Sequence, residues 1–274
     1  MSGRTPRRWT LAAATAALAL TAAAGCGGGK DGATVQGVKL IEKGALTSCT
    51  HLPYPPFQVE KDGKVVGFDV DLVDLVAKKL GVTQKIVDTP FETMKTGSAL
   101  NAGKCDIVMG GMTIKPDRVA TMDVSKPYFD ATQALMAKKG SGITSLDDVK
   151  NKKLKLGSQA STTGEDHVKG KGLNPRSFDN SLAELDGLRT GQVDVIVQDY
   201  PVVQGWLKDP ANAKYEIAAN LETGEQYGFW MRKGHNPKLV EMTDQVIAEA
   251  KASGSYKAIY EKWIGPMPKE GGAS

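Results

Sequence analysis

Residues 106–118, DIVMGGMTIKPDR, join a short apolar run to two glycines and a single arginine. The apolar run predicts a buried strand, because a few apolar and β-branched residues bounded by turn signals fit a covered sheet better than a helix. Gly110 and Gly111 lack a Cβ, so their backbone can approach a ligand closely and point N–H groups at an anion. Thr113 adds a hydroxyl and Arg118 a permanently charged guanidinium. The stretch predicts either a carboxylate site or, more plainly, a turn followed by a solvated surface arginine.

The segments before this stretch alternate between strands and helices. The predicted order is a strand at 45–49, a hairpin turn at Asp62-Gly63, a helix at 69–80 with Asp69 as its N-cap, a strand at 84–88 and a helix at 93–102. Such alternation is typical of an α/β fold with a parallel sheet and right-handed crossovers. In these sheets ligands bind at the carboxyl ends of the strands, where Tyr54, Gly110 and Gly111 are all expected to lie.

A proline-rich loop follows the first of these strands. Its prolines prevent further ladder pairing and stiffen the loop, so its side chains are held in place. Tyr54 and Phe57 in this loop either form an aromatic wall for a ligand or cap a core.

A second series of elements begins near residue 145. Hydroxyls at Thr162 and Thr163 open a predicted helix, which is both a capping pattern and a candidate anion site. The β-branched run 193–197 predicts a strand that places Asp199 at its carboxyl end. Asp199 is then positioned either to meet a ligand cation or to cap the turn before Pro201.

Residues 1–25 have the pattern of an export signal, with arginines before an apolar run too short for an ordinary membrane-spanning helix. The small residues before Cys26 resemble a bacterial lipobox, which implies cleavage there and lipid attachment to the Cys26 sulfur. Arg7-Arg8-Trp9 also resembles a twin-arginine signal, so the export route stays open. Glycine-rich residues 26–36 predict a flexible tether, and residues 266–274 a polar tail.

The charge of the chain excludes one class of partner. Without residues 1–25, which contain three arginines and no acids, 32 basic and 31 acidic side chains remain, a formal charge of +1. The chain therefore lacks the excess of basic residues that is typical of nucleic-acid-binding proteins. The cysteines and histidines have no zinc-site spacing, so no metal is expected. In an exported chain, Cys49 and Cys105 are expected to form a disulfide between neighbouring strands, the alternative being two buried thiols.

The ordered set of motifs resembles the bacterial extracellular solute-binding proteins of family 3, the polar amino-acid receptors of ABC importers. The motifs are Gly67-Phe68-Asp69-Val70-Asp71-Leu72 and the segments 54–57, 106–118, 125–128, 161–165, 198–199 and 260–265. The resemblance implies an α/β fold of the periplasmic-binding-protein type II, with lobe 1 formed by residues 37–130 and 226–265 and lobe 2 by 131–225. Two crossing segments, near 129–135 and 222–229, would form the hinge.

The resemblance also assigns roles within the cleft. Arg118 would hold the ligand α-carboxylate with help from Thr113, Thr162 and Thr163, Asp199 would hold the α-ammonium, Gly110 and Gly111 would lie beside the ligand, and Tyr54 and Phe57 would line the side-chain pocket. Opposite charges suit a zwitterion, because charge-assisted bonds are strong in a closed cleft. His51 stands where receptors for basic amino acids and glutamine tend to carry aspartate, and an imidazole can donate to a carboxylate or amide. Glutamate or glutamine is therefore the expected ligand.

The implied protein is a monomeric, non-enzymatic lipoprotein without cofactors. It would be exported, anchored by lipid to the outer face of the cytoplasmic membrane, and bind a free amino acid and the permease subunits of the importer. The rival is an enzyme, because some proteins with this fold resemble cyclohexadienyl or arogenate dehydratases. Such chemistry needs an acid–base group beside the substrate, and apart from Glu165, which the pattern assigns to a helix cap, the matched loops contain no extra acid.

Overall fold

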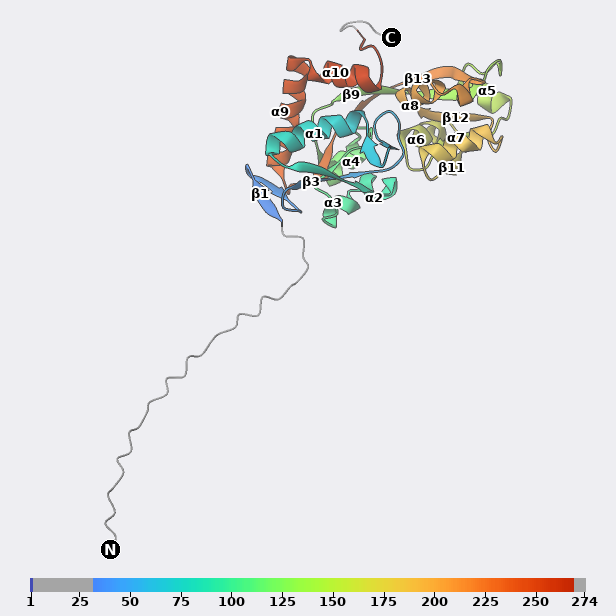
Figure 1. The fold of residues 1–274 in the computed structure, drawn as a ribbon. Coiled ribbons are helices and arrows are strands. Elements are labelled where there is room, and N and C mark those ends of the chain that lie inside the picture. The colour runs from blue at the N-terminus through green and yellow to red at the C-terminus, as the bar shows by residue number, and fades with distance from the viewer. Residues whose placement is uncertain (2–31, 269–274) are drawn as a thin grey trace.

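A computed structural model describes Met1 and residues 32–268 of the chain (Figure 1). The predicted export signal, Cys26 and most of the tether lie outside the described residues, as does most of the polar tail. The described chain forms two five-stranded sheets with helices packed around each. Figure 1 shows α1, α9 and α10 at one end of the molecule and α5 and α7 at the other. The α/β fold class predicted from the sequence is confirmed.

The first sheet has the strand order β6-β3-β7-β14-β8. Strand β3 is parallel to β6 and β7, whereas β14 is antiparallel to β7 and β8. The strands are β3 (Ala45–Thr50), β6 (Thr83–Asp88), β7 (Ile107–Val108), β8 (Met122–Val124) and β14 (Trp230–Arg232). The helices around this sheet are α1 (Phe68–Leu80), α2 (Phe91–Lys95), α3 (Ser98–Asn101), α4 (Pro116–Thr121), α9 (Pro237–Ser253) and α10 (Ser255–Trp263). We call this unit the first lobe.

The second sheet has the order β11-β10-β12-β9-β13, and we call it and its helices the second lobe. Its strands are β9 (Phe129–Lys138), β10 (Leu156–Gln159), β11 (Arg176–Phe178), β12 (Val195–Asp199) and β13 (Tyr215–Tyr227). Its helices are α5 (Leu146–Asn151), α6 (Thr163–Gly170), α7 (Ser181–Arg189), α8 (Tyr200–Leu207) and the 3₁₀ turn η1 (Pro210–Asn212). The long strands β9 and β13 pair with each other as far as Phe129 and Tyr227, where the chain passes between the lobes.

Two hairpins complete the fold, β1 (Ala33–Val35) with β2 (Val38–Leu40) and β4 (Val59–Lys61) with β5 (Lys64–Val66). The predicted turn at Asp62-Gly63 is confirmed. Both residues have positive φ, 52° and 70°, as the tightest hairpin turns require.

The N-cap of helix α1 lies two residues earlier than the sequence predicts. This N-cap is Gly67, with φ of 152°, and a Cβ at this position would lie 2.1 Å from the carbonyl oxygen of Phe57. The prediction that Asp69 caps the helix was wrong. Asp69 is buried in the first turn, where its carboxylate accepts the N–H groups of Gly110 and Gly111 at 2.8 and 2.9 Å. An acid that sequence reasoning assigned to its own helix therefore anchors a turn in another part of the lobe.

The prediction of a single helix at 93–102 was also wrong, because this part of the chain forms two short helices, α2 and α3. Gly97 between them has φ of 77°, a left-handed conformation that ends one helix and begins the next. Helix α2 begins at Phe91, which lines the site described below.

The disulfide between Cys49 and Cys105 is confirmed. It joins β3 to the segment before β7, with Cα atoms 5.6 Å apart, and both residues are buried in the core of the first lobe. Along the part of the chain that the structure describes, no helix combines the length and the apolar character needed to cross a lipid bilayer.

Candidate functional site

Residues at the ends of strands from both sheets meet around one cavity between the lobes. The empty space among its lining residues is about 410 Å³, open solvent included. The predicted site residues that line it are His51, Tyr54, Gly110, Gly111, Thr113, Arg118, Thr162, Thr163 and Asp199. Four further lining residues were not predicted, namely Gln58, Phe91, Met94 and Gln159.

Arg118 is a buried cation at this cavity. It lies on α4, is 4% exposed, donates to the carbonyl oxygen of Thr113 at 2.9 Å and lies 5.7 Å from the ring centre of Phe91. Burial lowers the pKa of the guanidinium, and the nearby acids, led by Asp117, oppose that shift. Among the described residues, no carboxylate oxygen lies within 4.0 Å of its nitrogens. A buried charge without an ion-pair partner is costly unless something else supplies the opposite charge, so Arg118 is suited to bind an anion.

Asp199 is the buried acid at the same cavity. Its carboxylate accepts the hydroxyl of Tyr54 at 2.5 Å, and also the hydroxyl of Tyr227 and the amide of Gln133. Burial raises the pKa of Asp199 to about 6, and the charge of Glu225 adds to the rise. Although Asp199 stands at the N-cap position of α8, its side chain makes no capping hydrogen bond. The carboxylate is therefore directed to the cavity rather than to its own helix.

Gly110 and Gly111 line the cavity, but their N–H groups donate to Asp69. The expectation that these N–H groups point at a ligand anion is not met, because a buried carboxylate of the protein takes them. Burial raises the pKa of Asp69 to about 7, while the hydrogen bonds oppose the rise. Gly111 matters as a close approach, since a Cβ there would lie 3.0 Å from the ring of Tyr54 and 3.2 Å from that of Tyr227.

The two aromatic residues of the proline-rich loop have different positions. Tyr54 lines the cavity, whereas Phe57 is fully buried and is not part of the cavity wall. The Phe57 ring packs 5.9 Å from that of Tyr54, centre to centre, and edge-on against Phe68, Phe129 and Tyr227. Both alternatives left open by the sequence therefore apply, with Tyr54 as wall and Phe57 as the core beneath it.

The cavity lining contains polar atoms without hydrogen-bond partners among the described residues. Within residues 32–268, both ring nitrogens of His51 and the Oε1 atoms of Gln58 and Gln159 are buried without a partner. Nδ1 of His51 lies 3.7 Å from a carboxylate oxygen of Asp88. Phe91 and Met94 add apolar surface to the cavity. Buried polar atoms are normally satisfied, so this part of the lining is suited to a polar ligand group.

Sequence reasoning missed Glu225, a buried acid beside the cavity. Its Oε2 accepts the hydroxyls of Thr113 at 2.6 Å and Thr163 at 2.8 Å, and its Oε1 accepts the amide of Gln133 at 3.0 Å. The residues around Glu225 are mostly polar, and exposed positions alternate with half-buried or buried ones along the strand. This pattern is typical of a solvated strand, so no local signal marked Glu225. Gln159 could have been found, because it ends strand β10 and strand ends meet at the ligand edge of such sheets.

Thr162 has the structural role expected of its hydroxyl. It is the N-cap of α6 and accepts the N–H of Glu165 at 3.2 Å. No group of three or more His, Cys, Asp or Glu side chains arranged to hold a metal ion occurs among the described residues.

Comparison with known proteins places this site in context. Residues 46–266 match the family model described as "Bacterial extracellular solute-binding proteins, family 3". A Neisseria gonorrhoeae protein named "Probable histidine-binding protein" is 35% identical over 97% of each chain. The Escherichia coli L-cystine-binding protein TcyJ is 31% identical over 83% of this chain and 85% of its own.

Solved structures agree. The structure titled "An ancestral arginine-binding protein bound to glutamine" is 40% identical, with a TM-score of 0.75, and covers 81% of this chain and 99% of its own. Its similarity extends across both lobes and confirms the type II periplasmic-binding fold. The chain belongs to the bacterial extracellular solute-binding proteins of family 3, whose relatives include amino-acid-binding proteins of ABC transporters.

Proposed function

We propose that this protein captures a free amino acid between its two lobes and delivers it to an ABC importer. Arg118 holds the α-carboxylate and Asp199 holds the α-ammonium, with Thr113, Thr162 and Thr163 beside the carboxylate. The observation that carries the proposal is the buried guanidinium of Arg118, which lines the same cavity as Asp199 and has no carboxylate partner among the described residues. A zwitterion supplies the missing charge to both groups.

The ligand that fits best has an uncharged polar side chain, and we favour glutamine over glutamate. Two amide oxygens, from Gln58 and Gln159, and the two ring nitrogens of His51 have no hydrogen-bond partner among the described residues. A ligand amide can donate to those oxygens. A ligand carboxylate would meet the same acceptors, and Arg118, the permanent cation among the lining residues, is taken by the α-carboxylate. The names of relatives include histidine, cystine, arginine and glutamine, so the side-chain end is where the choice is made.

The cellular setting proposed is that of an exported lipoprotein. Cys26 carries the lipid, residues 26–36 act as the tether, and the two lobes (37–130 with 226–265, and 131–225) close on the ligand at the outer face of the membrane. Family membership supports export, and the small residues before Cys26 support the anchor. Mass spectrometry of the purified protein tests the anchor. A diacylglyceryl group on Cys26, lost together with membrane association in Cys26→Ser, is the expected result.

A thermal-shift screen of the common amino acids, followed by calorimetry, tests the ligand proposal. We expect glutamine to give the largest stabilisation. Arg118→Ala should weaken binding roughly a hundredfold, because it removes a charge-assisted contact in a buried cavity. Arg232→Ala is the matched control, since Arg232 is an exposed arginine on β14. Unchanged affinity in Arg118→Ala would refute the assignment.

An enzymatic role is the second candidate. The ancestral amino acid-binding protein AncCDT-1, titled a precursor of cyclohexadienyl dehydratase, is 34% identical with a TM-score of 0.73. Glu165 is the extra acid in the matched loops. Its carboxylate accepts hydrogen bonds from the Ser161 N–H at 2.8 Å and from the Ser177 hydroxyl, and it forms an ion pair with Lys169 at 3.0 Å. Glu165 is not among the cavity-lining residues. This arrangement favours binding over catalysis. Turnover of prephenate or arogenate by the purified protein would reverse that conclusion.

A further inference from the structure

One carboxylate oxygen is shared by the two lobes. Glu225 lies on β13, the strand that leads back toward the first lobe, and is 9% exposed. Its Oε2 accepts the hydroxyl of Thr113, which follows β7 in the first lobe, and the hydroxyl of Thr163, which begins α6 in the second. Through these two hydrogen bonds the carboxylate links a residue of the first lobe to a residue of the second. Hydrogen bonds to a buried charged group are among the stronger ones in proteins.

Glu225 lies behind the ligand cavity rather than in it. Thr113 and Thr163 line both that cavity and a groove of about 900 Å³, whereas Glu225 lines only the groove. The two threonines therefore form a wall between cavity and groove, and Glu225 holds this wall from the groove side. A ligand in the cavity does not need to displace the carboxylate.

Glu225 also connects to the acid that faces the ligand. Its Oε1 accepts the amide of Gln133 at 3.0 Å, and the same amide nitrogen donates to Asp199. The carboxylate thus contacts both residues of the wall and, through Gln133, the proposed ammonium site. These contacts order residues from both lobes that otherwise depend on separate elements of the fold.

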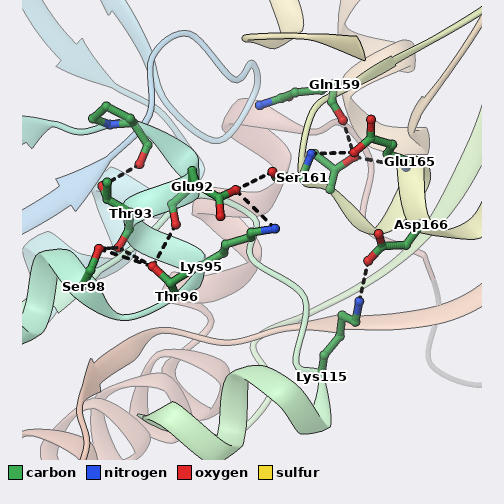
Figure 2. Close-up of polar contacts among 12 residues, drawn as sticks. Glu92, Thr93, Lys95, Thr96, Ser98, Lys115, Gln159, Ser161, Glu165 and Asp166 are labelled. Atoms are coloured by element: carbon green, nitrogen blue, oxygen red, sulfur yellow. Dashed lines mark hydrogen bonds and ion pairs between the residues drawn. The ribbon is translucent and has the colours of Figure 1, made fainter. Parts of the chain in front are cut away.

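Two further contacts between the lobes are more exposed (Figure 2). Lys115 forms an ion pair with Asp166 at 2.8 Å, and Ser161 donates to Glu92. Exposed pairs of this kind contribute little to stability in water. Another buried contact between the lobes, from Tyr54 to Asp199, lies at the ligand cavity, whereas the Glu225 carboxylate lies outside it.

We propose that Glu225 is a positioning residue, which stabilises the closed arrangement of the lobes through Thr113 and Thr163 independently of the amino acid. Contacts made only in the closed form raise its population, and a ligand that binds that form then has a higher apparent affinity. The effect on lobe position stands by itself. Only the effect on affinity rests on the proposed function.

The test measures the distance between the lobes without added ligand. Spin labels are placed at N101C on α3 and K171C after α6, two exposed positions, in the full chain with Cys26→Ser. Bound amino acid is removed by unfolding, dialysis and refolding. Glu225→Ala removes both acceptors, and Glu225→Gln retains one. Glu222→Ala is the matched control, since it deletes an exposed acid from the same strand.

We expect the unmodified sequence to populate a short distance that Glu225→Ala largely loses, that Glu225→Gln partly restores and that Glu222→Ala leaves unchanged. Affinity for glutamine should fall roughly tenfold in Glu225→Ala and less in Glu225→Gln. Identical distance distributions with and without the Glu225 carboxylate would overturn the inference. If Glu225→Ala does not fold, Thr163→Val, which removes one donor, must lengthen the distance for the inference to stand.

The design separates two failures. If no amino acid binds the unmodified protein, the proposed function fails, yet the distances still decide the role of Glu225. If glutamine binds and the distances do not respond to Glu225→Ala, only the positioning role fails.

Discussion

The hydroxyl of Tyr54 donates to the carboxylate of Asp199 at a distance of 2.5 Å, although the two residues are 145 positions apart in the chain. Tyr54 belongs to the loop after β3 in the first lobe, and Asp199 ends β12 in the second. The same hydroxyl lies 3.1 Å from Oε1 of Gln198. The aromatic wall of the cavity and the proposed ammonium site are therefore one structural unit, formed across the boundary between the lobes.

Removing the hydroxyl in Tyr54→Phe should weaken glutamine binding by roughly threefold to tenfold, because Asp199 loses a donor that orients it while the ring remains as a wall. Calorimetry measures the change. Tyr200→Phe is the control, since the Tyr200 hydroxyl accepts from Gln204 on the same helix and does not line the cavity. Equal affinities in the two variants would show that the contact with Asp199 does not contribute.

Affinity should depend on pH through Asp199. Its pKa is raised to about 6 by burial, and the ammonium ligand requires the ionised carboxylate. Binding should thus be strongest above pH 6. Below pH 6 the affinity should fall, and well below it the loss should approach about tenfold per pH unit. Dissociation constants measured between pH 4.5 and 8 test this.

Two variants separate Asp199 from the neighbouring histidine. Asp199→Asn should bind weakly with little pH dependence, because it no longer titrates. His51→Gln should keep the decline near pH 6. If the decline disappears in His51→Gln and persists in Asp199→Asn, the histidine is the titrating group and the prediction is wrong.

Gly110→Ala should both destabilise the protein and change its ligand preference. Gly110 has φ of 146°, which side chains rarely adopt, and a Cβ there would lie 3.1 Å from Nε2 of Gln58. We expect a loss of about 1–3 kcal/mol in the free energy of unfolding and an altered ranking of amino acids. Gly44→Ala is the control, because Gly44 has φ of 79° and open space around it. It should lose stability without a change in ranking, whereas the same ranking in both variants would exclude a role for Gly110 in specificity.

Replacing both Cys49 and Cys105 by alanine should lower the free energy of unfolding by about 2–5 kcal/mol, because the bond closes a loop of 56 residues and restricts the unfolded chain. Urea unfolding of the oxidised protein and of the double variant measures the difference. Ligand affinity should change little, since neither cysteine lines the cavity. Superimposable unfolding curves would contradict the prediction.

The parts of the fold that the sequence predicts well depend on neighbours in the chain. The apolar face of α1, the turn at Asp62-Gly63 and the buried strand β7 follow from the spacing of apolar residues and from backbone preferences within a few positions. The positions of Arg118 and Asp199 at strand or helix ends follow from the same local patterns. Their roles could be named because the ordered motifs resemble a known family.

The tertiary structure decided the points where local signals are silent or ambiguous. Asp69 has the pattern of a helix cap, yet it binds the Gly110 and Gly111 turn 41 and 42 residues away. The sequence does not distinguish Tyr54 from Phe57 as a pocket residue, and only the packing of the core shows that Phe57 is fully buried. Glu225 lies in a polar strand, and its partner Thr113 is 112 residues distant. A sequence determines which elements form through interactions between near neighbours, but which side chains meet across the cleft depends on how the two lobes pack, and no local pattern records that.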